Sequence, residues 1–457
     1  MAEPIDRRTF LRTGLGLTGA LAVGACTTSP RSTARRAPSQ ALAVFVSAAD
    51  LAEADRPAVE IAAFGSSYWK PGPERLYGYA LRDLAEYLGK VTGDLYPLTA
   101  ADAVGGGGVY AGTFGQFQGF VARQPASAQA LSSSDPEAFV VEGQGDKLFV
   151  LGKTRLGLIA ATYTLLDALG CRWFAPGPEW ESVPHGGHLS TDQLQMASAG
   201  PSYHARFFFS SFGANFSVFD EGRRDRLYLL WNLRNRMGGS QYVSNSHHAP
   251  IIPATLFSTR PELFAQAEGK RVPYELARGN PEAVAMATDI AVNYLRDNAG
   301  KGSYFDSFSA EPNDGVPADE ESLARIGNHT ATDLDFWFAN QVAAGIEKAD
   351  LTDKSVGILS YSDHASIPSF DLHPQVSVQV ATDLDFTSKM TVEQRLDGFR
   401  QRNAKRLGIY EYLNLIIWSS DRPGVSPSAK PAEVAANLKR WHDHGARTYT
   451  AETSDSW

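Results

Sequence analysis

The sequence predicts an α/β protein in which a small α/β domain precedes a (β/α)8, TIM-like barrel. From about residue 200 onward, short apolar segments typical of strands alternate with amphipathic segments typical of helices, which is the pattern of a parallel sheet covered by helices. No glycine-rich dinucleotide turn follows the first of these strands, which favours a barrel over a doubly wound sheet. The 457 residues suffice for two or three domains.

Composition excludes several classes of protein. The chain has 42 basic and 51 acidic residues, and its basic residues form no block outside the extreme N-terminus. Phosphate binding needs a basic face, so we expect no nucleic-acid partner. Two cysteines, Cys26 and Cys171, cannot build a disulfide framework or a thiolate metal cluster. The sequence has no serine-esterase elbow or phosphate-loop lysine, and we expect no cofactor.

Residues 1–26 predict an export signal. The segment DRRTFL at 6–11 is similar to the twin-arginine motif, and the apolar stretch after it is too short to span a bilayer of about 30 Å. The sequence VGAC ending at Cys26 is similar to a lipoprotein signal-peptidase box, which predicts lipidation of Cys26; plain cleavage is the alternative. Residues 27–40 have the composition of a flexible tether. We therefore expect a protein of the cell envelope or periplasm, lipid-anchored to the membrane.

Residues 41–190 predict the small α/β domain. The expected strands lie at 59–62, 108–112, 138–141 and 147–151, and a turn signal joins the last two as a hairpin. The expected helices lie at 76–88 and 155–169, where apolar residues recur at helical spacing.

Residues 200–457 predict the barrel. The expected strands lie at 204–209, 302–309, 355–361, 376–380, 407–412 and 447–452. The expected helices between them lie at 281–296, 330–348, 391–402 and 431–444. Because active sites of such barrels lie at the carboxyl ends of the strands, polar residues at these ends are the candidate site residues.

Carboxylates end several of these strands. The segment SAEPNDG at 309–315 places Glu311, Asn313 and Asp314 within four residues, although an Asp-Gly turn is the alternative role of Asp314. Glu411 and Glu452 end two later strands, where burial of a charge is costly unless the site is wet or the charge is paired. Three aspartates show the same pattern and, like the glutamates, have ion pairing at the rim as the alternative: Asp363, Asp383 and Asp385.

Aromatic, amide and imidazole groups follow the same strand ends. Tyr361 precedes His364, and two further candidates, Asn414 and Trp418, follow Glu411. Flat rings next to amides and carboxylates are typical of a carbohydrate site, although a core position is the alternative for a single Trp. The adjacent pair His247 and His248 cannot face one metal together from a regular strand or helix. We therefore expect these histidines to hydrogen-bond to substrate or to a catalytic carboxylate.

Two sets of motifs carry family resemblances. Residues 157–177, GLIAATYTLLDALGCRWFAPG, followed by ESVP at 181–184, resemble the accessory domain that precedes the barrel in family 20 β-hexosaminidases and family 67 α-glucuronidases. This resemblance implies a small sheet backed by helices that does no chemistry and packs against the barrel.

The second resemblance covers most of the chain after residue 41. Its motifs occur in the order seen in a large bacterial family that is regarded as glycoside-hydrolase-like and classed only as a domain of unknown function: WNLRNRM at 231–237, HH at 247–248, RPELF at 260–264, NPE at 280–282, PNDG at 312–315 and FANQVA at 338–343. Many relatives carry a cysteine-rich run after the Asp-Gly, and this chain lacks it. Relatives also continue beyond the last residue, so the resemblance implies a barrel truncated after its last strand.

These observations predict an exported glycoside hydrolase that acts on a poly- or oligosaccharide. In a two-carboxylate mechanism one acid protonates the leaving oxygen and the other group activates water or attacks the sugar. We expect Glu311 to be the acid and Glu411 or Glu452 to be the base or nucleophile. The residues expected to bind substrate are Asp314, Asn313, His247, His248, Tyr361, Asn414 and Trp418. The alternatives are a non-catalytic carbohydrate-binding lipoprotein that uses the same barrel mouth and a structural envelope protein with a blocked mouth.

Overall fold

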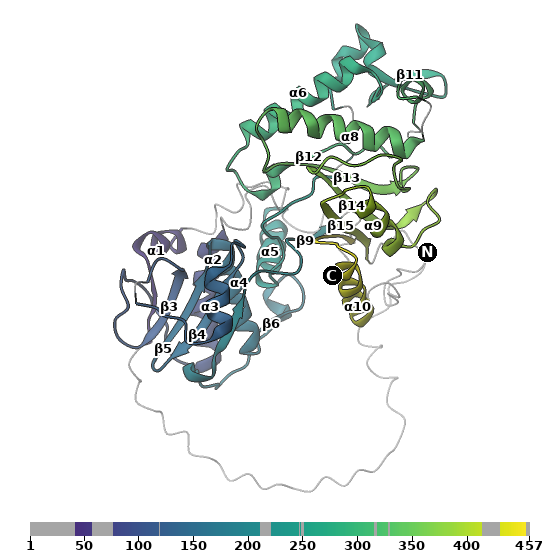
Figure 1. Cartoon of the computed structure of the whole chain (residues 1–457). Helices are drawn as coiled ribbons and strands as arrows, with labels where there is room; N and C mark the ends of the chain where they lie inside the picture. The colour runs from purple at the N-terminus through teal and green to yellow at the C-terminus, as the bar shows by residue number, and fades with distance from the viewer. Residues whose placement is uncertain are drawn as a thin grey trace, which may run out of the picture. The chain divides into compact units, whose positions relative to one another are not determined.

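The computed structural model describes residues 42–56, 76–117, 119–210, 221–245, 247, 251–314, 318–327, 330–413 and 430–453 (Figure 1). The export signal, Cys26, the tether and the strand expected at 59–62 lie outside these residues. Within the described ranges, no helix is both long enough and apolar enough to cross a bilayer.

The first half of the described chain forms a six-stranded mixed sheet with the order β2-β1-β3-β5-β4-β8. Its strands are β1 (Val44–Val46), β2 (Leu98–Ala100), β3 (Gly108–Thr113), β4 (Phe139–Gln144), β5 (Lys147–Gly152) and β8 (Gln195–Ser198). The accompanying helices and short strands are α1 (Ala48–Ala54), α2 (Tyr77–Thr92), α3 (Pro125–Ser132), α4 (Arg155–Ala168), β6 (Arg172–Trp173) and β7 (Glu181–Ser182). The expected hairpin is confirmed, because β4 and β5 pair antiparallel through a turn with Gly145 in the left-handed region.

The second half forms a six-stranded sheet in which all neighbours are parallel, with the order β12-β13-β14-β15-β16-β9. Its strands are β9 (Ala205–Ser210), β12 (Ser307–Ser309), β13 (Ser355–Ser362), β14 (Val376–Asp385), β15 (Arg406–Tyr412) and β16 (Thr448–Thr453). Each of the six strands expected in this region has a counterpart, but the one expected at 302–309 is confined to Ser307–Ser309, because Ser303–Asp306 forms a 3-10 helix. The described residues thus form a half-barrel sheet of six parallel strands.

Two segments of the second half are not parallel strands of this sheet. β10 (Phe264–Ala267) and β11 (Lys270–Leu276) pair with each other as a separate antiparallel hairpin. The second of these segments, residues 238–245, begins at Gly238, which forms an isolated antiparallel β-bridge with Arg206 of β9. It continues to Ser244, whose N–H donates to Ser307 Oγ at 3.0 Å, and to Asn245, whose Nδ2 donates to Gln379 Oε1 at 2.6 Å. This segment therefore runs across the sheet between its two edge strands.

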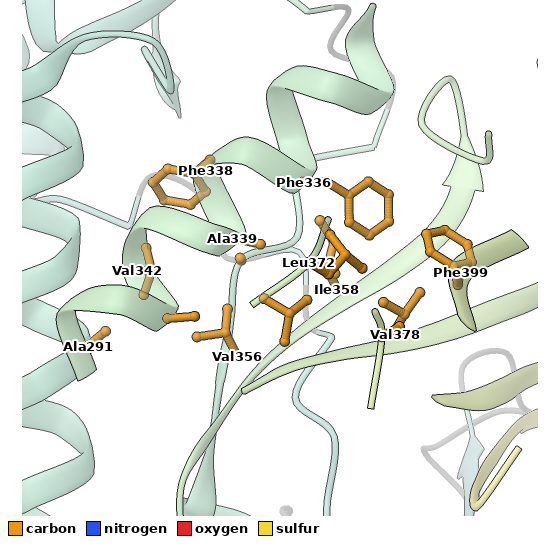
Figure 2. Packing of buried hydrophobic residues seen from close by; sticks show 14 of the residues in the cluster. Ala291, Phe336, Phe338, Ala339, Val342, Val356, Ile358, Leu372, Val378 and Phe399 are labelled. Carbon is orange, nitrogen blue, oxygen red and sulfur yellow. The ribbon is translucent and has the colours of Figure 1, made fainter. Parts of the chain in front are cut away.

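Helices cover the other face of the half-barrel sheet. They are α6 (Pro281–Asp297), α8 (Ala331–Lys348), α9 (Val392–Gln401) and α10 (Pro431–Asp443), and the short α7 (Glu320–Arg325) precedes α8. Alternate strand residues face these helices, as the period of two requires. Figure 2 shows Val356 and Ile358 of β13 packed among Phe336, Ala339 and Val342 of α8.

The helices begin where side chains satisfy their first N–H groups. Asn280 caps α6 before a proline at the first position, and capping boxes at Thr330 and Thr391 start α8 and α9. Each cap fixes where a helix starts, so the loops between strand ends and helices have defined lengths. These loops carry the candidate site.

The helix α5 (Glu221–Arg234) joins the core of the first half. Leu229 and Leu233 are buried in the cluster formed by the first sheet and its helices. Arg234 lies 2.8 Å from both Asp83 of α2 and Glu181 of β7.

We predict that Gly357→Ala destabilises the half-barrel. A Cβ at position 357 of β13 would lie 1.9 Å from the carbonyl oxygen of Ser244, which is backbone and has no rotamer with which to move aside. Overpacking of this kind lowers the free energy of unfolding by about 1–3 kcal/mol. Urea denaturation measures the change, and Gly115→Ala, whose Cβ meets nothing within 4 Å, is the control. Equal stability of the two variants would contradict the packing of residue 244 on β13.

Candidate active site

A pocket of about 360 Å³, including the space open to solvent, lies at the carboxyl ends of β12 and β13. Residues that follow these two strands form most of its wall, and the start of α8 and one histidine of the segment after 245 complete it. The lining residues are His247, Glu311, Pro312, Asn313, Asp314, Ala318, Ala331, Asp335, Tyr361, Ser362, Asp363 and His364. The prediction that strand ends carry the polar pocket therefore holds for the ends of β12 and β13.

Glu311 forms the floor of the pocket and has a side chain with 0% exposure. Its Oε2 accepts a hydrogen bond from the backbone N–H of Leu359 in β13 at 2.7 Å. Its Oε1 lies 2.9 Å from Nε2 of His364. Both oxygens of Glu311 are therefore engaged by partners inside the protein. Glu311, which we expected to act as the acid, thus has neither carboxylate oxygen exposed at the pocket surface.

Three more buried charged side chains are linked to His364, each within ion-pair distance of the one before it. Its Nδ1 lies 3.6 Å from Oδ2 of Asp335 in α8, and Oδ1 of the same carboxylate lies 2.6 Å from Nη1 of Arg278. Nη2 of Arg278 lies 3.1 Å from Oε1 of Glu275 in β11. The five side chains alternate in sign, and we call them the buried charge chain.

The pKa of His364 shows how the charges of the chain support one another. Burial lowers this pKa, but the charge of Glu311, its hydrogen bond and the charge of Asp335 raise it more, so the net shift is upward. His364 is therefore held as a cation between two carboxylates. Arg278 is fully buried as well, and Glu275 and Asp335 keep its pKa above the usual value.

The charges of three of the candidate carboxylates act on Tyr361. Burial raises its pKa first, and the charge of Asp314, a hydrogen bond with Asp314 and the charges of Glu311 and Glu452 raise it further. The pKa of Tyr412 of β15 is raised by burial and then by Tyr361 and the same three carboxylates. The charges of three carboxylates therefore act on two neutral phenols; Glu311 and Asp314 follow β12, and Glu452 belongs to β16.

His247 and Asp314 lie beside each other in the open part of the pocket. Nδ1 of His247 lies 2.6 Å from the carbonyl oxygen of Pro312, so this nitrogen carries the proton. Nε2 is thereby turned toward Asp314 and lies 3.6 Å from its Oδ1. The Asp314 side chain is 63% exposed, so a substrate can reach it.

Glu452 and Glu411, the two other predicted carboxylates, lie on opposite faces of the sheet. Glu452 of β16 accepts a hydrogen bond from the hydroxyl of Tyr410 at 3.0 Å and is partly exposed. Glu411 lies on the same face of β15 as Leu407 and Ile409, which pack against the helices. Its carboxylate accepts a hydrogen bond from the hydroxyl of Tyr449. Burial raises the pKa of Glu411 and the Tyr449 hydrogen bond opposes it. The structure does not bring Glu411 to the pocket.

The remaining predicted residues divide into two groups. Asn313 lines the pocket, but its Nδ2 donates to the carbonyl oxygen of Tyr274 and its N–H donates to Glu275 at 2.9 Å, so this residue holds the loop on β11. His248, Asn414 and Trp418 lie outside the described residues. In the part of the chain that the structure describes, no three His, Cys, Asp or Glu side chains are grouped to hold a metal ion.

The sequence analysis missed Asp335, Arg278, Glu275 and Tyr412. A signal for Asp335 was available: it lies three, four and seven positions before Phe338, Ala339 and Val342, on the apolar stripe of its helix. A carboxylate on a buried stripe is costly without a partner, which is a reason to look for a cation nearby. Arg278 and Glu275 lie outside any periodic segment, and no local pattern marks them.

We predict that His364→Gln changes the pH dependence of stability. The pKa of His364 is raised by folding, so its proton stabilises the native state below the unfolded value of about 6.5, and this contribution is lost as pH rises through the folded pKa. The free energy of unfolding of the wild type should therefore fall relative to that of His364→Gln as pH rises above about 6.5.

Urea denaturation at a series of pH values checks this prediction, and His188→Gln, which removes an exposed imidazole, is the control. Parallel curves for the wild type and His364→Gln would show that His364 is not held as a cation.

No protein-family model and no curated protein matches the chain. Solved structures with loose similarity include β-N-acetylhexosaminidase from Bacteroides fragilis, with 10% identity, a TM-score of 0.42, and coverage of 78% of this chain and 76% of that one. The GH20 exo-β-N-acetylglucosaminidase from Vibrio harveyi in complex with N-acetylglucosamine has 10% identity, a TM-score of 0.40, and coverage of 92% and 66%. The GH20 β-N-acetylhexosaminidase from Streptomyces coelicolor has 14% identity, a TM-score of 0.33, and coverage of 82% and 79%. Similarity at this level does not assign an activity to the chain.

Proposed function

We propose that the chain is a glycoside-hydrolase-like protein that acts on a poly- or oligosaccharide at the mouth of the half-barrel. The observation that carries this proposal is the polar pocket at the carboxyl ends of β12 and β13, which Glu311, Asp314 and Tyr361 line together. The charge of Glu452 of β16 acts on Tyr361 as well. Hydrolysis of a glycosidic bond needs two carboxyl groups in different roles, and this mouth offers carboxylates in three different environments.

Asp314 and Glu452 are the pair that we assign to the substrate. The hydroxyl of Tyr410 donates to Glu452, which leaves this carboxylate as an acceptor and suits a base or nucleophile. Asp314 is exposed and lies next to Nε2 of His247, a group that can supply and withdraw a proton, so Asp314 suits the acid. Glu311 does not touch the substrate in this assignment and acts as a positioning residue below them.

The phenols and the imidazole suit recognition of a sugar. Tyr361 has a raised pKa and stays neutral, so its hydroxyl can donate to a sugar oxygen or to a carboxylate. The pocket volume of about 360 Å³ is near the lower end of the range for small-ligand sites. Such a pocket suits the end of a glycan chain more than a long internal stretch of it.

The second candidate function is non-catalytic binding of carbohydrate at the same mouth. One observation favours it: the side chain of Glu311, the carboxylate at the centre of the site, has 0% exposure and is used in the buried charge chain. A binding protein needs the rings and hydroxyls of the mouth but no free acid and base.

We predict that Asp314→Asn and Glu452→Gln each lower the rate of glycan hydrolysis by about 10²-fold or more, because each removes an acid or base from the reaction. The assay uses a panel of 4-nitrophenyl glycosides and oligosaccharides, with Asp289→Asn, an exposed aspartate of α6, as the control. Unchanged rates in both variants would contradict the assignment. Binding of glycans by a wild type that hydrolyses none of them would favour the second function.

We also propose that the chain is exported and anchored to the membrane by a lipid on Cys26. The support for this proposal is the sequence alone: the arginine pair at residues 7 and 8 and the small residues before Cys26.

We predict that Cys26→Ser moves the protein, expressed in a bacterium with twin-arginine export, from the membrane fraction to the soluble fraction, because the thiol that takes the lipid is lost. Fractionation and the intact mass of the mature chain measure this. Cys171→Ser, which changes a buried cysteine of the first half, is the control and should stay in the membrane fraction. Equal membrane retention of both variants would contradict lipidation at Cys26.

A further inference from the structure

The loop at residues 385–390 carries two large apolar side chains that the core does not cover. Phe386 is 66% exposed and Met390 is 40% exposed. The loop follows β14 at its carboxyl end, and this end of the sheet is also where the pocket-lining residues 361–364 follow β13. The loop that carries these two side chains therefore leaves the sheet at the same edge as the pocket.

Hydrogen bonds fix the backbone of this loop. Oδ1 of Asp385 accepts from the N–H groups of Thr387 at 3.1 Å and Ser388 at 2.8 Å. Oδ2 of Asp385 lies 3.7 Å from Nε of Arg395 in α9, a side chain that is 2% exposed. Arg395 also donates to the carbonyl oxygens of Ser360 in β13 and Ala381 in β14, at 3.1 and 2.5 Å. One buried arginine thus ties the loop to the ends of both strands.

The loop is joined directly to the wall of the pocket. The N–H of Phe386 donates to the carbonyl oxygen of Ser362 at 3.4 Å, and Oγ1 of Thr387 donates to the carbonyl oxygen of Asp363 at 3.4 Å. Ser362 and Asp363 both line the pocket. The residue that carries the exposed phenyl ring, Phe386, is therefore hydrogen-bonded through its backbone to a residue of the pocket wall.

Backbone strain is concentrated on these two adjoining loops. Ser362, Leu384 and Lys389 have φ values of 51, 58 and 53°, in the left-handed region that side chains with a Cβ rarely adopt. They are three of the seven non-glycine residues with positive φ in the described part of the chain. A strained backbone conformation persists only where many surrounding contacts hold it in place. Such residues are concentrated at ligand sites.

We propose that Phe386 is an aromatic platform on which a second sugar ring of the substrate stacks, next to the ring held in the pocket. This inference rests on the proposed function and names the substrate class of the site: a glycan of at least two rings. A fixed loop presents the phenyl face without an ordering cost on binding, and the exposed Asp363 beside it can accept hydrogen bonds from sugar hydroxyls.

The test compares binding of glycans of different length. A glycan array of mono- to hexasaccharides identifies what the full wild-type chain binds, and calorimetry then gives the Kd for the best oligosaccharide and for its terminal monosaccharide. We expect Phe386→Ala to weaken oligosaccharide binding about tenfold, the loss that one buried ring face produces, and to leave monosaccharide binding unchanged. Phe386→Trp should retain oligosaccharide binding, and Phe174→Ala, which removes a phenyl ring that is 68% exposed in the first half, should have no effect.

Equal binding of the oligosaccharide by the wild type and Phe386→Ala would overturn this inference. The proposed function would still stand if Asp314→Asn had lost hydrolysis in the same preparation. A wild type that neither binds nor cleaves any glycan of the panel would overturn both. An equal loss in Phe174→Ala would also overturn the inference, because it would show that the effect does not come from the pocket wall.

Discussion

The ion pair between Glu311 and His364 is the interaction on which the candidate site depends. A carboxylate with no exposed surface is strongly destabilising unless a cation and hydrogen-bond donors meet it. His364 supplies the cation, and the N–H of Leu359 supplies a second donor. The His364 cation is itself buried, and the charge of Asp335 offsets it. Asp335 in turn forms an ion pair with Arg278. Removal of one partner from such a chain leaves a buried charge uncompensated, which costs about 3–5 kcal/mol.

The same chain of charges explains why the mouth of the half-barrel has a defined shape. Its members come from β11, the loop before α6, the end of β12, α8 and the loop after β13, so one network joins five separate parts of the chain. Asn313 is held on the same network through Glu275, which places the neighbouring Asp314 at the opening. Tyr361 lines the same pocket as this loop, and the charges of Asp314 and Glu452 both raise its pKa. The groups that we assign to the substrate are therefore positioned by groups that the substrate does not touch.

Much of the fold and part of the site follow from local patterns. The six parallel strands and the helices with caps at Asn280, Thr330 and Thr391 are visible in the sequence because apolar periodicity and capping side chains are local signals. Glu311 and Asp314 could be placed at the pocket because they follow a strand directly. Three structural outcomes needed information beyond these local patterns. Glu411 and Glu452 both end a strand, but their side chains lie on opposite faces of the sheet. The register between β15 and β16 determines which face each side chain occupies. The partners of His364 come from segments far apart in the sequence, and the segment at 238–245 has no periodicity that predicts its path across the sheet.

A crystal structure with a bound oligosaccharide tests the central claim most directly, because it reports where the sugar lies relative to the two assigned carboxylates. The account predicts a sugar ring beside Tyr361, with a glycosidic oxygen between Asp314 and Glu452 and with their carboxyl groups about 5–5.5 Å apart for a retaining reaction or about 6.5–9.5 Å apart for an inverting one. A sugar bound at the mouth with these two groups outside both ranges would contradict the catalytic claim and leave carbohydrate binding. A sugar bound elsewhere, for example in the cavity between Trp173 and Trp231, would contradict the assignment of the site itself.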